Sequence, residues 1–115
     1  MEKNITILLD QAPSLKLAEK MRMGLGLTLV DENRVNILVI ADGIRTFLIK
    51  PGEDRSYDPF DLSKHLLMLS QVEVPFFIEQ EAAINANIKS DSKSNLTLLD
   101  SNQISIFLSK QSAIL

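Results

Sequence analysis

The stretch Val35-Asn36-Ile37-Leu38-Val39-Ile40, which runs into the turn Ala41-Asp42-Gly43, decides the fold. A short, nearly continuous apolar run that ends at a turn signal is typical of a strand buried on both faces of a parallel sheet. The segment Ile5-Thr6-Ile7-Leu8-Leu9 has the same character and ends at Asp10. We therefore predict two buried strands, over residues 5–9 and 35–40, each followed by a turn that carries an aspartate.

A long helix is expected between these two strands. Asp10-Gln11-Ala12-Pro13-Ser14 is a loop that places Pro13 or Ser14 near a helix start. Apolar or small residues then recur at helical spacing, and they are Leu17, Met21, Gly24, Leu25 and Thr28. This periodicity predicts a helix over residues 14–30, closed by a polar turn over residues 31–34.

The second half of the chain continues the alternation of helix and strand. Asp58-Pro59 is typical of an N-cap followed by proline at the first helical position, which predicts a helix over residues 59–71. Val74-Pro75-Phe76-Phe77-Ile78 predicts a further strand, with Glu79 at its carboxyl end. The remaining predictions are a short strand or helical turn over residues 44–49, a surface loop over 50–58, a short helix over 81–86, a polar linker over 91–95, a helical turn or short strand over 96–99 and a last strand over 104–108.

Strands that alternate with helices predict an α/β fold with parallel strand pairing. The chain of 115 residues has the size of one domain with one core. We therefore expect residues 1–115 to form a single-domain, three-layer sandwich. Its centre is a mainly parallel sheet of four or five strands, with helices on both faces.

The charge balance excludes several classes of function. Twelve basic and fifteen acidic side chains give a formal charge of −3, so there is no basic surplus for nucleic acid or anionic lipid.

The apolar stretches are too short for a membrane span. Charges interrupt every stretch before it reaches the roughly 20 apolar residues that span a bilayer. The apolar run over residues 5–9 is too short for the core of a signal peptide. We expect a cytoplasmic protein that binds neither nucleic acid nor membrane.

The sequence contains no cysteine. This excludes disulfides, thiolate metal sites, thiol nucleophiles and persulfide chemistry.

Two segments resemble the DsrE/DsrF-like proteins of sulfur-relay systems. Val39-Ile40-Ala41-Asp42-Gly43-Ile44 is similar to the Asp-Gly-Val loop that follows their second strand. Val72-Glu73-Val74-Pro75-Phe76-Phe77-Ile78-Glu79, with a short helix reaching Ile88, resembles their third strand and the segment that holds the sulfur-carrying cysteine. The resemblance covers almost the whole chain. It implies a cytoplasmic α/β subunit that assembles into a trimer, a hexamer or a mixed ring with cysteine-bearing relatives.

The chain departs from this family where the family's chemistry takes place. The position that matches the family cysteine falls on or next to Glu79, and the Arg-Gly pair that closes the short helix is replaced by Ala86-Asn87. A persulfide carrier needs a polarizable thiolate, which a carboxylate cannot replace. Direct sulfur transfer by this chain is therefore excluded, and we expect no catalytic residue for it.

Three acidic residues are predicted at the carboxyl ends of strands, where ligands bind in open parallel sheets. They are Asp10, Asp42 and Glu79, and with Gly43 they form the candidate pocket. Three carboxylates at one edge can bind a hard cation such as magnesium, or one of them can act as a general base if its pKa is raised. The alternative is structural, with Asp10 and Asp42 capping loops and helices and Glu79 solvated. The sequence identifies no cofactor.

Two further features have structural and functional interpretations. His65 is the only histidine, and its apolar neighbours favour a partly buried structural role over a catalytic base. Ile114 and Leu115 place two large apolar side chains near the end of the sequence, which indicates either an interface or docking on the same subunit.

Two functional hypotheses follow. The first is a non-catalytic, oligomeric DsrE-like subunit or accessory factor, either homo-oligomeric or paired with a cysteine-bearing relative. The second is a small-molecule or metal-binding protein, a hydrolase included, that uses the acidic edge of the sheet.

Overall fold

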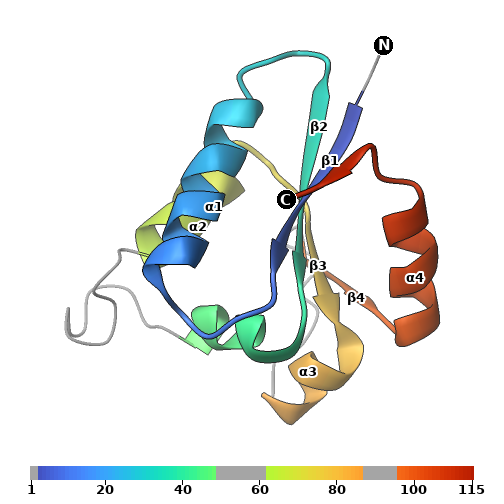
Figure 1. Cartoon of the computed structure of the whole chain (residues 1–115). Helices are drawn as coiled ribbons and strands as arrows, with labels where there is room; N and C mark the ends of the chain where they lie inside the picture. Colours follow the sequence, from blue (N-terminus) through green and yellow to red (C-terminus); the bar gives the residue numbers. More distant parts are fainter. Residues whose placement is uncertain (1–2, 49–61, 87–95) are drawn as a thin grey trace.

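A parallel sheet forms the centre of the molecule in the computed structural model, which describes residues 3–48, 62–86 and 96–115 (Figure 1). All strand pairs are parallel, and the strand order is β4-β3-β2-β1-β5. The strands are β1 (Lys3–Leu9), β2 (Asn33–Val39), β3 (Phe76–Glu79), β4 (Leu96–Leu99) and β5 (Ala113–Ile114). The predicted α/β class and parallel sheet are confirmed.

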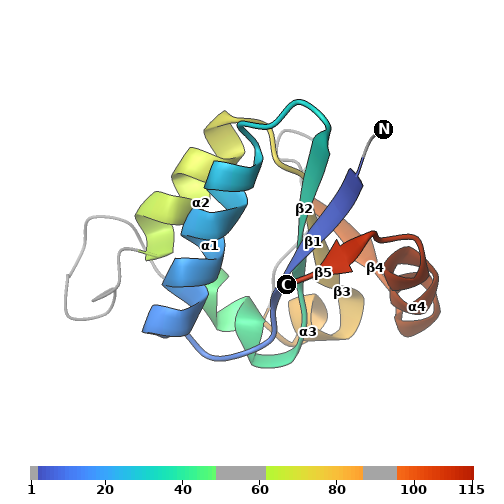
Figure 2. The same ribbon diagram turned by 45° about the horizontal axis from the view of Figure 1, so that its top comes forward.

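Helices cover both faces of this sheet. The helices α1 (Leu15–Leu27) and α2 (Leu62–Gln71) lie side by side on one face, and α4 (Ser101–Ser109) lies on the other (Figures 1 and 2). The 3-10 helix η1 (Ala41–Leu48) follows β2, and α3 (Gln80–Asn85) follows β3. Both short helices therefore begin at the carboxyl edge of the sheet, where the candidate residues were predicted.

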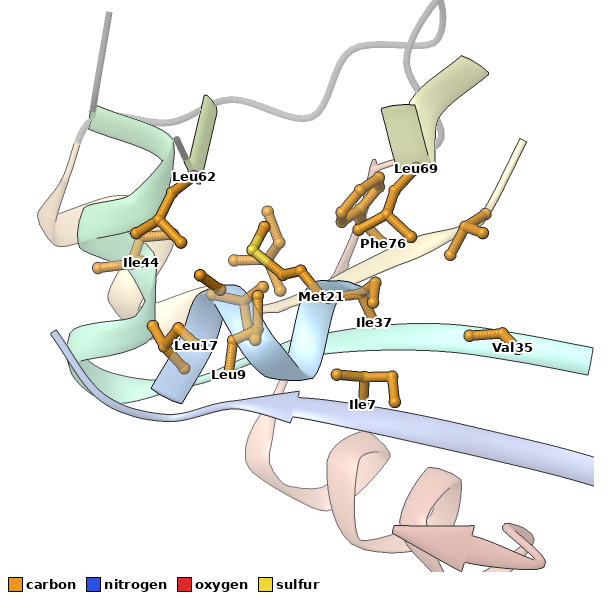
Figure 3. Close-up of a cluster of buried hydrophobic side chains, with 14 of the residues drawn as sticks. Ile7, Leu9, Leu17, Met21, Val35, Ile37, Ile44, Leu62, Leu69 and Phe76 are labelled. Carbon is orange, nitrogen blue, oxygen red and sulfur yellow. The ribbon is translucent and has the colours of Figure 1, made fainter. Parts of the chain in front are cut away.

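The core fills the space between the sheet and the α1–α2 layer (Figure 3). Ile7 of β1 is paired in register with Ile37 of β2, which is paired with Phe76 of β3. Leu17 and Met21 of α1 are completely buried against these strands. Apolar residues at helical spacing thus meet the apolar runs of the strands, as the sequence pattern predicts.

The start of α1 is set by its N-cap. The side chain of Ser14 accepts a hydrogen bond from the N–H of Leu17 at 3.3 Å. This confirms the predicted start, whereas the helix ends at Leu27, earlier than the expected residue 30. There the hydroxyl of Thr28 donates to the carbonyl of Leu25 at 2.6 Å.

The predicted last strand over residues 104–108 is wrong, because these residues belong to helix α4. Asp100 caps this helix by accepting from the N–H of Gln103 at 2.8 Å, while the Gln103 side chain accepts from the N–H of Asp100 at 2.9 Å. This reciprocal capping box fixes the first turn of a helix. The helix turns Phe107 toward Phe77 of β3, with ring centroids 4.6 Å apart.

The actual last strand is β5, which docks on the same chain. Leu115 donates its N–H to the carbonyl of Thr6 at 2.9 Å, and Leu8 donates to the carbonyl of Leu115 at 3.1 Å. Of the two interpretations of the apolar residues Ile114 and Leu115, the structure shows docking on the same subunit. Their side chains nevertheless remain partly exposed.

Other boundaries differ from the predictions by a few residues. Residues 41–48 form the 3-10 helix, β3 begins at Phe76, and residues 96–99 form a strand. The predicted loop over 50–58, the helix start at 59, the linker over 91–95, Asn87 and Ile88 lie outside the described residues. None of the helices within the described ranges is both long enough and apolar enough to cross a membrane.

Candidate functional site

Glu79 joins two strand ends at the carboxyl edge of the sheet. It is the last residue of β3 and the N-cap residue of α3, but its side chain makes no capping hydrogen bond. Its Oε1 instead accepts from the backbone N–H of Ala41 at 3.1 Å. Ala41 begins the turn after β2 and has a φ of 49°, in the left-handed region that non-glycine residues seldom adopt. The carboxylate of Glu79 thus holds the turn after β2 against the end of β3.

Gly43 is required at this edge by the close approach of two backbone segments. A Cβ atom at this position would lie 1.9 Å from the carbonyl oxygen of Leu9, at the end of β1. The N–H of Gly43 donates to the carbonyl of Ile40 at 3.0 Å. The Asp-Gly step therefore serves to fold η1 tightly over the end of β1.

A cavity of about 540 Å³ opens between η1 and α3. Asp42, Glu79 and Glu81 bring three carboxylates to its lining. Asp42 and Glu81 are exposed, and Glu79 is half-buried. The other lining residues are Ala41, Ile44, Ala82, Asn85 and Ala86.

A second cavity, of about 290 Å³, lies on the other side of α3. It shares Glu79, Glu81 and Asn85 with the first cavity and adds Asp100 of the α4 N-cap. Among the described residues that line these two cavities, the charged side chains are all carboxylates. This surface, which we call the acidic edge (Asp42, Glu79, Glu81 and Asp100), favours cationic groups and hydrogen-bond donors.

Only part of the predicted pocket comes together. Asp42 and Glu79 line the same cavity, but Asp10 and Gly43 do not line it. The Oδ1 of Asp10 is buried and has no hydrogen-bond partner among the described residues. No three carboxylate or imidazole groups in the described ranges are placed to hold a metal ion. Asp10, Asp42 and Glu79 therefore do not surround one cation position in this structure.

Several site residues were missed by the sequence analysis. Glu81 and Asn85 lie four positions apart on α3 and so share one face of it. The helix predicted over 81–86 already puts them on one face, but the sequence does not show that this face lines the cavity beside η1. Asp100 was missed because the residues after it were predicted to form a strand.

His65 lies between α1 and α2, where only 9% of its surface is exposed. Its Nε2 accepts a hydrogen bond from Nε of Arg22 at 3.2 Å. The burial that the sequence predicted for His65 is confirmed, whereas its contact with Arg22 of α1 was not predicted.

Comparison with solved structures identifies a protein of the same fold. The chain is similar to the YchN protein of E. coli, with a TM-score of 0.76 and 18% identity over 100% of this chain and 98% of that one. No family profile and no curated protein matches the sequence. The comparison therefore shows the fold over the full length of the chain.

Proposed function

We propose that this protein is a cytoplasmic, cysteine-less DsrE-like subunit that has an assembly role, without catalysis, in an intracellular sulfur-relay system. The fold shared with YchN, a protein of DsrE-like fold, supports the kinship that the Asp-Gly loop and the segment around Glu79 suggest. The observation that carries the proposal is the place of Glu79. It stands between β3 and α3, where the resemblance puts the family cysteine.

The carboxylate of Glu79 cannot carry sulfur, and it has a structural role instead. Persulfide exchange needs a thiolate that attacks the outer sulfur of a donor persulfide, displacing the donor thiolate, and that itself leaves as a thiolate when the sulfur is passed on. A carboxylate does neither, and the sequence has no cysteine elsewhere. The Glu79 carboxylate is also engaged by the N–H of Ala41. Any sulfur chemistry in the assembly therefore belongs to a partner chain.

Exposed apolar side chains support self-association or pairing with a cysteine-bearing relative. Large side chains that are about half exposed occur on α2, after α2, on α4 and in β5, and they are Leu67, Val72, Ile106 and Ile114. In a trimer, a hexamer or a mixed ring such side chains are covered by neighbouring subunits.

Native mass spectrometry of the tagged protein, isolated gently from its host, tests the assembly. A complex with a cysteine-containing DsrE-like chain, or a homotrimer or homohexamer, is the expected result. A monomer at micromolar concentration contradicts the proposal. The spectrum also shows whether a small molecule is retained.

A Glu79→Cys variant tests whether Glu79 corresponds to the family cysteine. We expect the new thiol to accept sulfane sulfur from a competent persulfide donor, detected as a gain of one sulfur mass on the intact protein. A Ser101→Cys variant places an exposed thiol at the neighbouring cavity and serves as the matched control. Equal loading of both variants, or loading of neither, counts against the assignment of Glu79.

The acidic edge supports a second candidate function, the binding of a small cationic molecule. Asp42, Glu79 and Glu81 share one cavity without a basic lining residue among those described. A diamine is a suitable probe, and its binding is expected to weaken in Asp42→Asn and Glu81→Gln variants, as measured by backbone amide shifts. Absence of saturable shifts at millimolar diamine argues against this function and leaves the assembly proposal untouched.

A further inference from the structure

A groove of about 410 Å³ lies between α1 and α2 and has no lining residue in common with the acidic edge. Its polar lining consists of Arg22 from α1 and of Lys64 and His65 from α2. Its apolar lining consists of Leu25 and Met68. The groove thus combines positive charge with an apolar surface, in a chain whose formal charge is −3.

Within the described residues, the two cations of this groove have no carboxylate partner. In the described part of the chain, neither Arg22 nor Lys64 forms an ion pair. The one hydrogen bond of Arg22 uses its Nε and is accepted by Nε2 of His65 at 3.2 Å. A guanidinium has five N–H donors. The four N–H groups on the Nη atoms therefore remain for a ligand.

His65 fixes the direction of this guanidinium. An imidazole accepts a hydrogen bond at Nε2 only when that nitrogen is unprotonated. With 9% of its surface exposed, His65 is held by the helices around it and presents a fixed acceptor to the exposed Arg22 side chain. His65 is a positioning residue in this arrangement, and Arg22 and Lys64 are the groups that meet the ligand.

We infer that the groove between α1 and α2 binds a phosphate monoester that carries an apolar group. A phosphate monoester has a charge between about −1.5 and −2 at neutral pH, which matches one guanidinium and one ammonium. The planar guanidinium also suits phosphate oxygens geometrically. The apolar part of the ester packs on Leu25, which is half-buried, and on Met68, which is 42% exposed. This inference does not depend on the proposed function.

Phenyl phosphate is the probe, and the only histidine of the sequence is the reporter. In carbon–proton correlation spectra of the full chain without a histidine tag, His65 gives one set of imidazole signals. Titration at constant ionic strength is expected to shift these signals and the methyl signal of Met68 saturably. Inorganic phosphate is expected to bind more weakly than phenyl phosphate, and phenol alone to produce no saturable shift. No saturable shift with phenyl phosphate at millimolar concentration overturns the inference.

Charge-neutral variants separate a built site from general electrostatic attraction. Arg22→Gln and Lys64→Gln are each expected to weaken phenyl phosphate binding about tenfold, the effect of losing one charged hydrogen bond. Lys16→Gln is the matched control, because Lys16 is an exposed cation on the same helix α1 outside the groove. Equal weakening in the control and in Arg22→Gln contradicts a specific site. Unchanged amide spectra of the free variants exclude misfolding as the cause.

His65→Gln tests the positioning role separately. Glutamine keeps a side-chain acceptor, whereas His65→Leu removes it. Binding, followed here by the Met68 methyl signal, is expected to be weaker in the leucine variant than in the glutamine variant. Equal affinities of the two variants contradict the positioning role of the imidazole.

Discussion

The N–H of Ala41 donates to Oε1 of Glu79 at 3.1 Å, so the residue that starts the turn after β2 is held by the last residue of β3. This bond crosses 38 positions of sequence and joins two neighbouring parallel strands at their carboxyl ends. It also orders the wall of the cavity between η1 and α3, because both residues line that cavity.

Loss of this acceptor is expected to destabilise the fold. Glu79→Ala removes the carboxylate and leaves the Ala41 N–H without its partner, which costs about 1 kcal/mol at a partly exposed site. Glu79→Gln retains an acceptor and is expected to recover at least half of that loss. Urea unfolding followed by circular dichroism measures both. Equal losses in the two variants show that the hydrogen bond is not the source of the effect.

Gly43 is expected to tolerate no side chain. A Cβ 1.9 Å from the backbone oxygen of Leu9 cannot be relieved by a side-chain rotation. Gly43→Ala therefore costs about 3 kcal/mol, at the upper end for overpacking, or prevents folding.

Gly26 of α1 provides the matched control, because a Cβ there meets no atom within 4 Å. Gly26→Ala is expected to stabilise the protein by up to about 1 kcal/mol through helix propensity. Thermal unfolding of both alanine variants gives opposite shifts of Tm. A neutral Gly43→Ala contradicts the close approach of η1 and β1.

The capping box of α4 is expected to contribute measurably to stability. Asp100→Ala removes the acceptor of the Gln103 N–H and costs about 1 kcal/mol, whereas Asp100→Ser keeps an N-cap acceptor and is nearly neutral. Denaturant midpoints of the three proteins provide the comparison. A neutral alanine variant means that the helix is held by packing alone.

Phe77 and Phe107 are expected to be energetically coupled, since their ring centroids are 4.6 Å apart. A double-mutant cycle with leucine at each position is expected to give a coupling free energy of about 0.5–1.5 kcal/mol. Additive effects contradict a direct contact. Of the two single substitutions, the one at Phe107 tells more about how α4 is attached to the sheet, because Phe107 is the α4 residue of this contact.

The buried strands and the first helix were predictable because their signals are local. The apolar runs around Ile7 and Ile37 and the N-cap Ser14 lie where the sequence placed them. The strand over 104–108 was mispredicted because Ile104, Ile106 and Leu108 alternate with other residues, as in a strand. Ile104, Phe107 and Leu108 are also at helical spacing, and the capping box at Asp100 decides between the two. β5 was missed because two residues give no periodicity.

The candidate site was predictable only in part. Asp42 and Glu79 meet because β2 and β3 are neighbours and end at the same edge. Asp10 ends the next strand of the sheet, and its separation from that cavity follows from the path of η1 over β1, which no local pattern shows. The contact of Arg22 with His65 depends on how α1 and α2 pack, which sequence alone does not specify.

The position of β5 beside β1 has a consequence for biosynthesis. Asn4 and Ser112 are hydrogen-bonded across 108 positions, so the edge of β1 that pairs with β5 stays unpaired until that length of chain has left the ribosome. Open strand edges are sites at which nascent chains aggregate. Until residues 113–114 emerge, this edge of β1 is open to pairing with other nascent chains.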